Sequence, residues 1–531
     1  MSGTAPPPPD GEGYAWATED REQVAVIARN VTTRYLAIAA DMLIGFLMLP
    51  FNLHHLGQDA YGLWMLTASV TIHVSILDLG YGGALVKFVA QYRAHRDPQA
   101  LNEIASTLFF VFAAVGVTAY TIAAGLAFNL DHLFRISAAQ AQTGQWLLLI
   151  IGLNVALNFP FSVYGGVVSG FQRYDANSLT AIASSIAVAL TNVAILLGGF
   201  GLVPLVAATT SVRLLTYLIY RRNALRVYPP LRISPSLFRR SRLREATGFS
   251  VYSSLIDWAN RLNYGLDAVV IGAFMGSAPV AVWAIAERVI SGTQRLTNQL
   301  NGVLFPVVVD SDASNRPERL QRLLLEGTRL SLAMVLPIAV SLIVLADPLV
   351  RSWVGAKMIG SAPIIQILAV AVVLRVGNAT GSTLLKGSGR HRYLAAVNIT
   401  TGLANLALSA TLIHAFGLIG VAVGTLIPIA ISTTCVLHPA ACRRVDLPLS
   451  RSLRQAIWPA MWPAAVAAIA LLGSRQISSG TLLAVMFQAG AAAVLYFGLF
   501  FFIAIGRVDR TLYIARLRRL LGRDRQLAPA A

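Results

Sequence analysis

The stretch LDLGYGGALVKFVAQYRAHRDPQALN, residues 77–102, joins an apolar segment of membrane length to a dense run of basic side chains. The apolar segment begins near Tyr61 and contains Asp78 close to its end. About 20 apolar residues cross a bilayer, and Lys and Arg collect in cytoplasmic loops. The stretch therefore predicts the cytoplasmic end of a membrane helix whose carboxylate is hydrated or paired, followed by RDPQALN (96–102) as the start of a short interfacial helix.

The composition of the whole chain points to lipid as its solvent. The chain has 531 residues, of which 56% are hydrophobic and 12% charged, and the mean hydropathy is +0.64. A soluble protein carries about 25% charged residues and could not bury this much apolar surface. Two cysteines, Cys435 and Cys442, are too few for a disulfide framework or a four-ligand metal site. We therefore expect an all-α polytopic membrane protein.

Apolar runs of sufficient length predict fourteen transmembrane helices. Short GGFG (198–201) and HAFG (414–417) sequences alone separate the fifth span from the sixth and the eleventh from the twelfth. The predicted spans are 31–51, 61–84, 104–128, 145–167, 177–199, 201–220, 247–275, 279–306, 327–346, 361–383, 393–415, 417–438, 455–473 and 481–505.

The distribution of basic residues tests this topology. The two termini and every second loop hold 32 of the 42 Lys and Arg residues, when Arg329 at the start of the ninth span is counted with the loop before it. The alternate loops hold 4. The positive-inside rule then places both termini in the cytoplasm. The net charge of +18 faces anionic leaflet lipid, so we expect no nucleic-acid partner.

The chain also repeats itself. HRDPQALNEIASTLFF (95–110) resembles SNRPERLQRLLLEGTR (314–329), and a second pair of similar segments starts at Gly170 and Gly387. Both pairs are offset by about 220 residues, which predicts two six-helix units of parallel topology. The predicted parts are a disordered cytoplasmic tail (1–30), an N-terminal bundle (31–220), a basic linker (221–246), a C-terminal bundle (247–440), two additional helices (455–505) and a basic tail (506–531).

Charged residues inside the predicted spans are concentrated in the first two helices of each half. Spans one, two, seven and eight hold nine of the eleven charged residues. The two others are Arg213 and Arg375, which we interpret as packing or snorkelling residues. Polar stripes on spans seven and eight cannot face lipid cheaply, so they favour a water-filled cavity. The alternative is a set of structural ion pairs. The nine are Arg34, Asp41, Asp78, Asp257, Arg261, Asp267, Glu287, Arg288 and Arg295.

The sequence contains no HExxH metal motif, no Walker A motif and no segment long enough for a nucleotide-binding domain. We therefore expect a transporter rather than an enzyme, with no catalytic residue, no metal and no cofactor. A membrane glycan ligase or glycosyltransferase should display a large outside loop, and the longest such loop predicted here runs only over 129–144.

Two quoted segments resemble the bacterial polysaccharide transporter family of lipid-linked oligosaccharide flippases, in the multidrug/oligosaccharidyl-lipid/polysaccharide exporter superfamily. They are LDLGYGGALVKFVAQYRAHRD, starting at Leu77, and NYGLDAVVIGAFMGSAPVAVWAIAERV, residues 263–289. The resemblance implies two six-helix bundles that form a V around a cavity lined by helices one, two, seven and eight, with two extra C-terminal helices. It implies inner-membrane transport of an undecaprenyl-diphosphate-linked oligosaccharide by alternating access, for surface polysaccharide biosynthesis.

Two other transport functions stay open, a peptidoglycan-precursor flippase and a drug/cation antiporter. We expect partners among anionic lipid, a polysaccharide polymerase and glycosyltransferases. Without an ATP site, H⁺ or Na⁺ coupling or the membrane potential would drive transport. Because arginine suits phosphate, the predicted substrate-binding residues are Arg34, Asp78, Arg261, Arg288 and Arg295. The predicted ion-coupling residues are Asp41, Asp257, Asp267 and Glu287, with Asp267 as first choice.

Overall fold

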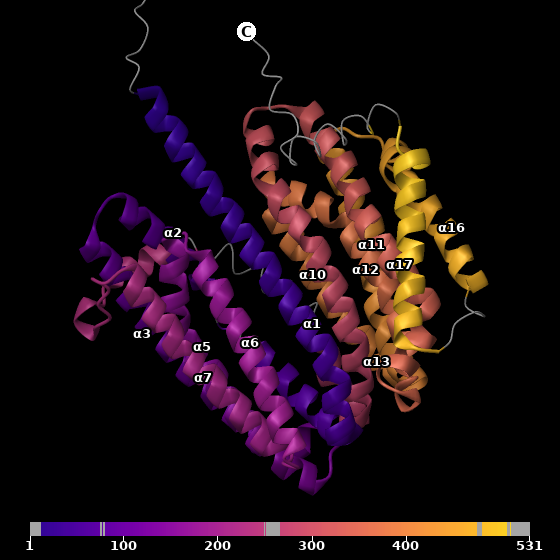
Figure 1. The fold of residues 1–531 in the computed structure, drawn as a ribbon, viewed down its shortest axis with the longest axis horizontal. Coiled ribbons are helices and arrows are strands. Elements are labelled where there is room, and N and C mark those ends of the chain that lie inside the picture. Colours follow the sequence, from indigo (N-terminus) through magenta and orange to yellow (C-terminus); the bar gives the residue numbers. More distant parts are fainter. Residues whose placement is uncertain are drawn as a thin grey trace, which may run out of the picture. The chain divides into compact units, whose positions relative to one another are not determined.

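The computed structural model describes residues 12–74, 77, 80–248, 250, 266–474, 480–506 and 510 (Figure 1), with side chains for all of these except 12–28, 31, 72 and 296–303. Throughout these ranges every regular element is a helix, which confirms the all-α prediction. The helices divide into two compact units. The N-terminal unit comprises residues 1–57, 70–131 and 137–254, and the C-terminal unit comprises 58–69, 132–136 and 255–531.

Long helices make up the N-terminal unit. Helix α1 changes direction at Gly57, where the backbone is left-handed (φ 78°), and its part after Gly57 up to Ser69 belongs to the C-terminal unit. The helices up to the linker are α1 (Glu12–Val74), α2 (Tyr81–Ala94), α3 (Pro98–Ala127), α4 (Leu130–Leu133), α5 (Ala138–Gly170), α6 (Tyr174–Leu197) and α7 (Leu202–Val227). A short 3₁₀ turn (Pro235–Leu237) and a helix over 240–248 follow in the linker.

The C-terminal unit repeats this plan and adds two helices. Its helices are α9 (Leu266–Met275), α10 (Ser277–Ala313), α11 (Pro317–Trp353), α12 (Ser361–Gly387), α13 (His391–Ala430), α14 (His438–Arg444), α15 (Leu449–Ser452), α16 (Trp458–Ser474) and α17 (Leu482–Leu499). Wider π-helical turns extend α13, α15 and α17 at their C-terminal ends.

Ten helical segments of the described chain are long and apolar enough to cross a membrane. Two of them, Thr32–Thr71 and His391–Arg444, contain the breaks at Gly57 and Gly417, so each holds two of the spans expected from the sequence. Ser277–Ala313 is a 37-residue helix that is not among the ten. The protein is therefore a multi-pass helical membrane protein, and the total of fourteen spans stays a prediction.

The internal repeat appears in the backbone as well as in the sequence. Left-handed residues recur at equivalent places in the two halves, where most side chains would be strained. Helices α3 and α11 both begin on a proline, at Pro98 and Pro317. The offset within each left-handed pair matches that of the sequence repeat, and the pairs are Gly57 and Gly276, Arg96 and Asn315, Gln172 and Gly389, and Gly199 and Gly417.

The second span differs from the prediction of one helix over 61–84. Helix α1 ends at Val74, and α2 begins only at Tyr81 after Gly80, whose left-handed φ of 70° breaks the regular helical backbone. Helix α2 then occupies residues that we expected to form a basic loop. Three glycines within LDLGYGG lower the helix propensity of this stretch, which explains the break.

Two other boundaries also need correction. The tail predicted to be disordered over 1–30 is helical from Glu12 onward, because its Ala, Glu, Gln and Arg residues after the proline run favour a helix. The interfacial helix predicted at RDPQALN is not separate from the third span. Helix α3 runs without a break from Pro98, with the Asp97 side chain accepting a hydrogen bond from the backbone N–H of Ala100 at 2.9 Å.

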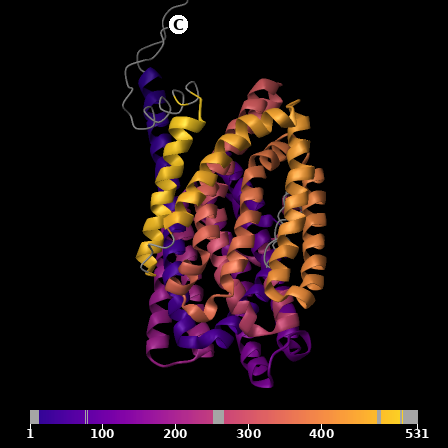
Figure 2. The same ribbon diagram turned by 90° about the vertical axis from the view of Figure 1, so that its right-hand side faces the viewer.

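The two additional helices, α16 and α17, pack on α11 at the edge of the C-terminal unit (Figure 2, which looks onto this side). Small alanines of α16 (460, 464 and 467) lie in one core cluster with Leu332, Val335 and Leu336 of α11. Tyr496 of α17 is fully buried in this cluster and donates a hydrogen bond to the backbone carbonyl of Ala460 at 3.1 Å. Among the described residues, Gln488 of α17 also donates to the carbonyl of Ser474 at 2.9 Å. The rest of the core cluster is apolar, so burial of hydrophobic surface holds the pair in place.

Candidate functional site

A hairpin at Gly417 creates a polar pocket of side chains inside the C-terminal unit. The chain turns back at this left-handed glycine, so the two arms of α13 pack against each other. The packing is close, because a Cβ atom placed on Gly424 would lie 2.7 Å from the backbone nitrogen of Ser409. This approach brings Asn405 and Ser409 of the first arm beside Thr425 of the second, and all three are buried.

Asp267, near the start of α9, reaches this cluster with a side chain that is only 8% exposed. The Thr425 hydroxyl lies 3.3 Å from Oδ1 of Asp267 and 3.2 Å from Oδ1 of Asn405. The Ser409 hydroxyl lies 2.9 Å from Oδ1 of Asn405. Both hydroxyls also approach the backbone carbonyl of Val421, at 3.4 Å from Ser409 and 3.1 Å from Thr425. We call Asp267, Asn405, Ser409, Val421 and Thr425 the oxygen cluster.

The oxygen cluster has more acceptors than hydrogens to share among them. Each hydroxyl carries one hydrogen, yet the two hydroxyls make five close oxygen contacts. Several of these contacts must therefore share a hydrogen between two oxygens. A small cation at the centre would be ligated by these oxygens, and protonation of the carboxylate would supply a further hydrogen. Over the described residues no group of three His, Cys, Asp or Glu residues could hold a metal ion. The one carboxylate of the oxygen cluster would balance a single positive charge.

Charged residues of neighbouring helices surround the oxygen cluster. Arg375 of α12 and Glu287 of α10 both interact electrostatically with Asp267. Tyr61, in the part of α1 that belongs to the C-terminal unit, is 5% exposed and interacts with Glu287 and with Arg288. Charges of both signs thus interact across α9, α10 and α12, which the sequence predicts to lie in the membrane, where single charges are costly and usually functional.

The structure brings together three of the residues predicted from sequence, Asp267, Glu287 and Arg288. Arg295 lies two turns further along α10 and is exposed. Arg34 is exposed and Asp41 half-buried on α1, in the N-terminal unit. Asp78, Asp257 and Arg261 lie outside the described residues, so their roles stay predictions.

Sequence reasoning missed part of this site. Arg375, which we interpreted as a packing or snorkelling residue, also interacts electrostatically with Asp267. Asn405, Ser409 and Thr425 were not predicted either, because single polar residues in apolar helices satisfy themselves locally more often than they bind a ligand. The available signal was their position, since Asn405 and Ser409 are spaced i, i+4 and face the predicted turn at HAFG.

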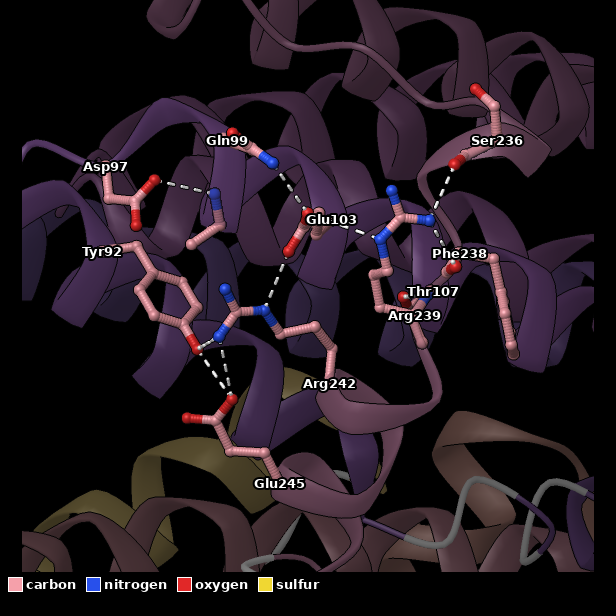
Figure 3. A network of polar contacts seen from close by, with 11 residues as sticks. Tyr92, Asp97, Gln99, Glu103, Thr107, Ser236, Phe238, Arg239, Arg242 and Glu245 are labelled. Atoms are coloured by element: carbon pink, nitrogen blue, oxygen red, sulfur yellow. Dashed lines mark hydrogen bonds and ion pairs between the residues drawn. The ribbon is translucent and has the colours of Figure 1, made fainter.

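A second polar cluster, which we call the linker clamp, lies in the N-terminal unit (Figure 3). Glu103 of α3 is 7% exposed and pairs with two arginines of the linker. Its carboxylate oxygens lie 3.6 Å from Nε of Arg239 and 3.1 Å from Nε of Arg242. The Tyr92 hydroxyl of α2 donates to Glu245 at 2.8 Å and accepts from Arg242 at 2.9 Å. Burial and the hydrogen bond to Glu245 raise the pKa of Tyr92 to about 12, so its phenol stays protonated.

Amide and hydroxyl side chains of α3 complete the linker clamp by binding the linker backbone. Asn102 donates to the carbonyl of Pro230 at 3.0 Å and accepts from the N–H of Arg232 at 3.0 Å. Ser106 donates to the carbonyl of Arg232, and the Thr107 hydroxyl accepts from the N–H of Arg239. The linker is therefore an ordered segment fixed along α3, rather than a free tether.

Several known proteins resemble this chain in sequence, in fold or in both. A family model described as polysaccharide biosynthesis protein matches residues 56–363. The "Probable flippase AglR" of Haloferax volcanii is 21% identical over 87% of this chain and 90% of its own length. The solved structure of the lipid II flippase MurJ aligns with a TM-score of 0.65 over 90% of this chain and 99% of its own, at 13% identity.

A multidrug resistance transporter of the MATE family aligns with a TM-score of 0.63 over 79% of this chain and 98% of its own, at 17% identity. At these identities the two alignments establish the fold, which is that of transporters of the MOP superfamily. The prediction of a transporter rather than an enzyme is confirmed. Because the family model matches more than half of its length, the chain belongs to the polysaccharide biosynthesis protein family.

Proposed function

We propose that this protein flips an undecaprenyl-diphosphate-linked oligosaccharide from the inner to the outer leaflet of the inner membrane. The observation that carries the proposal is the buried carboxylate of Asp267, which interacts electrostatically with Glu287 and Arg375 inside the helices of a transporter fold, in a member of a polysaccharide biosynthesis family. The name of the archaeal flippase relative supports the same class of activity. The excess of Lys and Arg on alternate loops supports cytoplasmic termini.

The proposed substrate carries a diphosphate, which needs cationic partners during transit. Arginine binds phosphate through two parallel N–H groups. Arg288 is near Tyr61 and Glu287 in the C-terminal unit, and Arg295 is exposed further along the same helix. Together with Arg34, Asp78 and Arg261 these residues are the proposed substrate-binding set. Arg288→Ala and Arg295→Ala should each slow export, whereas Arg322→Ala, an exposed arginine at the start of α11, should not.

The oxygen cluster is the proposed coupling site. A cation that neutralises Asp267 would remove the cost of burying its carboxylate. After release of that cation, the positive charge of Arg375 would stabilise the carboxylate. Na⁺ would use several of the five oxygens, whereas H⁺ would need only the carboxylate. Asp41, Asp257 and Glu287 are the other acids proposed to take part.

The substrate assignment is tested by reconstitution. Purified protein in proteoliposomes should translocate an undecaprenyl-diphosphate-linked oligosaccharide, measured by accessibility of the glycan to an external glycosidase. Lipid II and a cationic dye, offered in parallel, test the two other transport functions. Translocation of lipid II or the dye in place of the oligosaccharide would overturn the proposal. In the native cell, deletion of the gene should abolish a surface polysaccharide.

The coupling site is tested in the same vesicles under imposed gradients. Either a Na⁺ or a pH gradient should accelerate translocation, and the one that does identifies the ion. Asp267→Asn should remove this response, while Asp310→Asn, an acid at the exposed end of α10 paired with Arg319, should retain it. An unchanged response in Asp267→Asn would exclude the oxygen cluster. No response to either gradient in the parent protein would leave translocation driven by the membrane potential.

A further inference from the structure

The linker helix over 240–248 has two faces with different chemistry. One face is occupied by the linker clamp, because Arg242 and Glu245 bind Tyr92 and Arg242 binds Glu103. The other face presents Arg240 and Arg244, which are spaced i, i+4 and therefore lie side by side. Both are exposed, and within the described part of the chain neither guanidinium has a hydrogen bond or an ion pair.

A cavity of about 650 Å³ adjoins these two arginines. It is lined by Phe238, Arg240, Leu243, Arg244, Thr247 and Gly248, all within the N-terminal unit. The lining thus combines two guanidinium groups and one hydroxyl with apolar surface from Phe238 and Leu243. Figure 3 shows the Phe238 side chain directed away from Glu103, so it does not take part in the linker clamp.

This combination matches one chemical class of ligand, an anion attached to an apolar chain. The guanidinium groups of Arg240 and Arg244 can bind phosphate oxygens bidentately, while the apolar lining accommodates the first methylenes of an acyl chain. Basic pockets on the cytoplasmic side of membrane proteins bind anionic headgroups in this way. The linker belongs to the loops that hold the excess of Lys and Arg.

We propose that the cavity beside Arg240 and Arg244 is a binding site for the phosphate headgroup of an anionic glycerophospholipid of the membrane itself. The alternative source of a lipid phosphate is the diphosphate of the transported lipid. The membrane lipid is favoured because the site lies on the linker and outside helices α9, α10 and α12, which carry Asp267, Glu287 and Arg375. The bound headgroup would fix the free face of the linker helix to the leaflet, while the linker clamp fixes the opposite face to α3.

The site is tested with the full chain in detergent, mixed with phosphatidylglycerol or phosphatidylcholine and examined by native mass spectrometry. The parent protein should retain one phosphatidylglycerol against a phosphatidylcholine background. Arg240→Gln/Arg244→Gln should weaken this binding roughly thirtyfold, as two arginines near an anionic surface would. Arg221→Gln/Arg222→Gln removes the same charge from exposed positions at the end of α7 and should leave the bound lipid in place.

Two further measurements keep the proposal falsifiable. The melting temperature of Arg240→Gln/Arg244→Gln should equal that of the parent, because neither guanidinium has a hydrogen bond or an ion pair to lose among the described residues. Arg240→Lys/Arg244→Lys should bind with intermediate strength, since it keeps the charge and loses the fork. Equal loss in both glutamine pairs, or no loss in either, would overturn the site. Displacement of phosphatidylglycerol by undecaprenyl diphosphate would assign the cavity to the transported lipid instead.

Discussion

Asp267 in the first helix of the C-terminal half and Met48 in the first helix of the N-terminal half occupy equivalent positions of the repeat. Thr425 and Ala207 are equivalent in the sixth helices. The backbone turns at the same places in both halves, yet only the C-terminal half fills these positions with oxygen atoms. The duplication thus preserved the turns that set the helices and left the buried side chains free to specialise.

The N-terminal half has the more specialised side chains at another place, where each half binds the segment that follows its sixth helix. Glu103 in the N-terminal half pairs with two linker arginines, while Arg322 at the equivalent position is exposed. There Gln321 donates to the backbone carbonyl of Val445 at 2.7 Å, much as Asn102 donates to Pro230. The C-terminal segment is followed by α16 and α17, whose apolar packing on α11 holds it. The C-terminal half adds one ion pair, between Arg444 and Asp312, whereas the linker is held by two ion pairs to the buried Glu103.

The largest effect should come from removing the acid of the linker clamp. Glu103→Ala leaves the half-exposed Arg239 without a carboxylate partner, and leaves Arg242, whose side chain is 26% exposed, with only its 3.4 Å contact to Glu245. Breaking a buried pair costs about 3–5 kcal/mol, and solvent screening of these arginines lowers the expected cost of local opening to about 2 kcal/mol. Trypsin should then cleave after Arg240 or Arg244 roughly thirtyfold faster. Arg322→Ala, at the equivalent exposed position, should not change the rate, and equal rates in Glu103→Ala would contradict the clamp.

The next largest effect should come from replacing a residue of the oxygen cluster with its counterpart from the N-terminal half. Thr425→Ala reproduces Ala207 and removes the hydroxyl that contacts Asp267, Asn405 and Val421. Loss of such a partner should weaken apparent cation affinity roughly tenfold, measured as the ion concentration that half-saturates translocation. Thr425→Ser keeps the hydroxyl and should stay near the parent value. A lower affinity in Thr425→Ser than in Thr425→Ala would disagree with ligation by this oxygen.

A smaller effect is expected for the hydrogen bond between Gln321 and Val445 in the C-terminal half. Gln321→Ala removes one hydrogen bond to the Val445 carbonyl, worth about 1 kcal/mol. Trypsin should cleave at the exposed Arg451 roughly fivefold faster. An effect as large as that of Glu103→Ala would show that the two halves hold the segments after their sixth helices with equal strength.

The smallest effect concerns the phenol of the linker clamp and depends on pH. Because the folded pKa of Tyr92 is raised to about 12 from 10.0, its contribution is fully present below pH 10 and is lost as pH rises toward 12. Tyr92→Phe should therefore speed linker cleavage roughly threefold at pH 8, with the difference constant from pH 7 to 9.5 and smaller at pH 10.5. A difference that shrinks between pH 7 and 8 would mean that another group governs it.

Hydropathy and repeat spacing predicted the helices well because both signals extend over tens of residues. The turns at GGFG and HAFG, for example, lie where α6 ends and where α13 breaks. The charged part of the site was also predictable, since acids inside membrane helices are rare enough to stand out. The uncharged part was not, because Asn405 and Thr425 become neighbours only through the hairpin at Gly417. Likewise, nothing in the linker sequence distinguished Arg239 and Arg242, which are paired, from Arg240 and Arg244, which are not.

Residues 58–69 belong to the C-terminal unit although they are among the first to be made. Gln58 donates to the carbonyl of Ala278 at 3.1 Å, and a Cβ atom on Gly272 would lie 2.9 Å from a methyl carbon of Leu66. These partners lie far apart in the sequence, so at ordinary rates of synthesis the early segment waits roughly 10–40 s before its partners exist. During that interval a partly built membrane protein exposes an unmatched surface, which makes it a substrate for insertion chaperones and quality-control proteases. The order of translation thereby sets a time window in which this chain has to be protected.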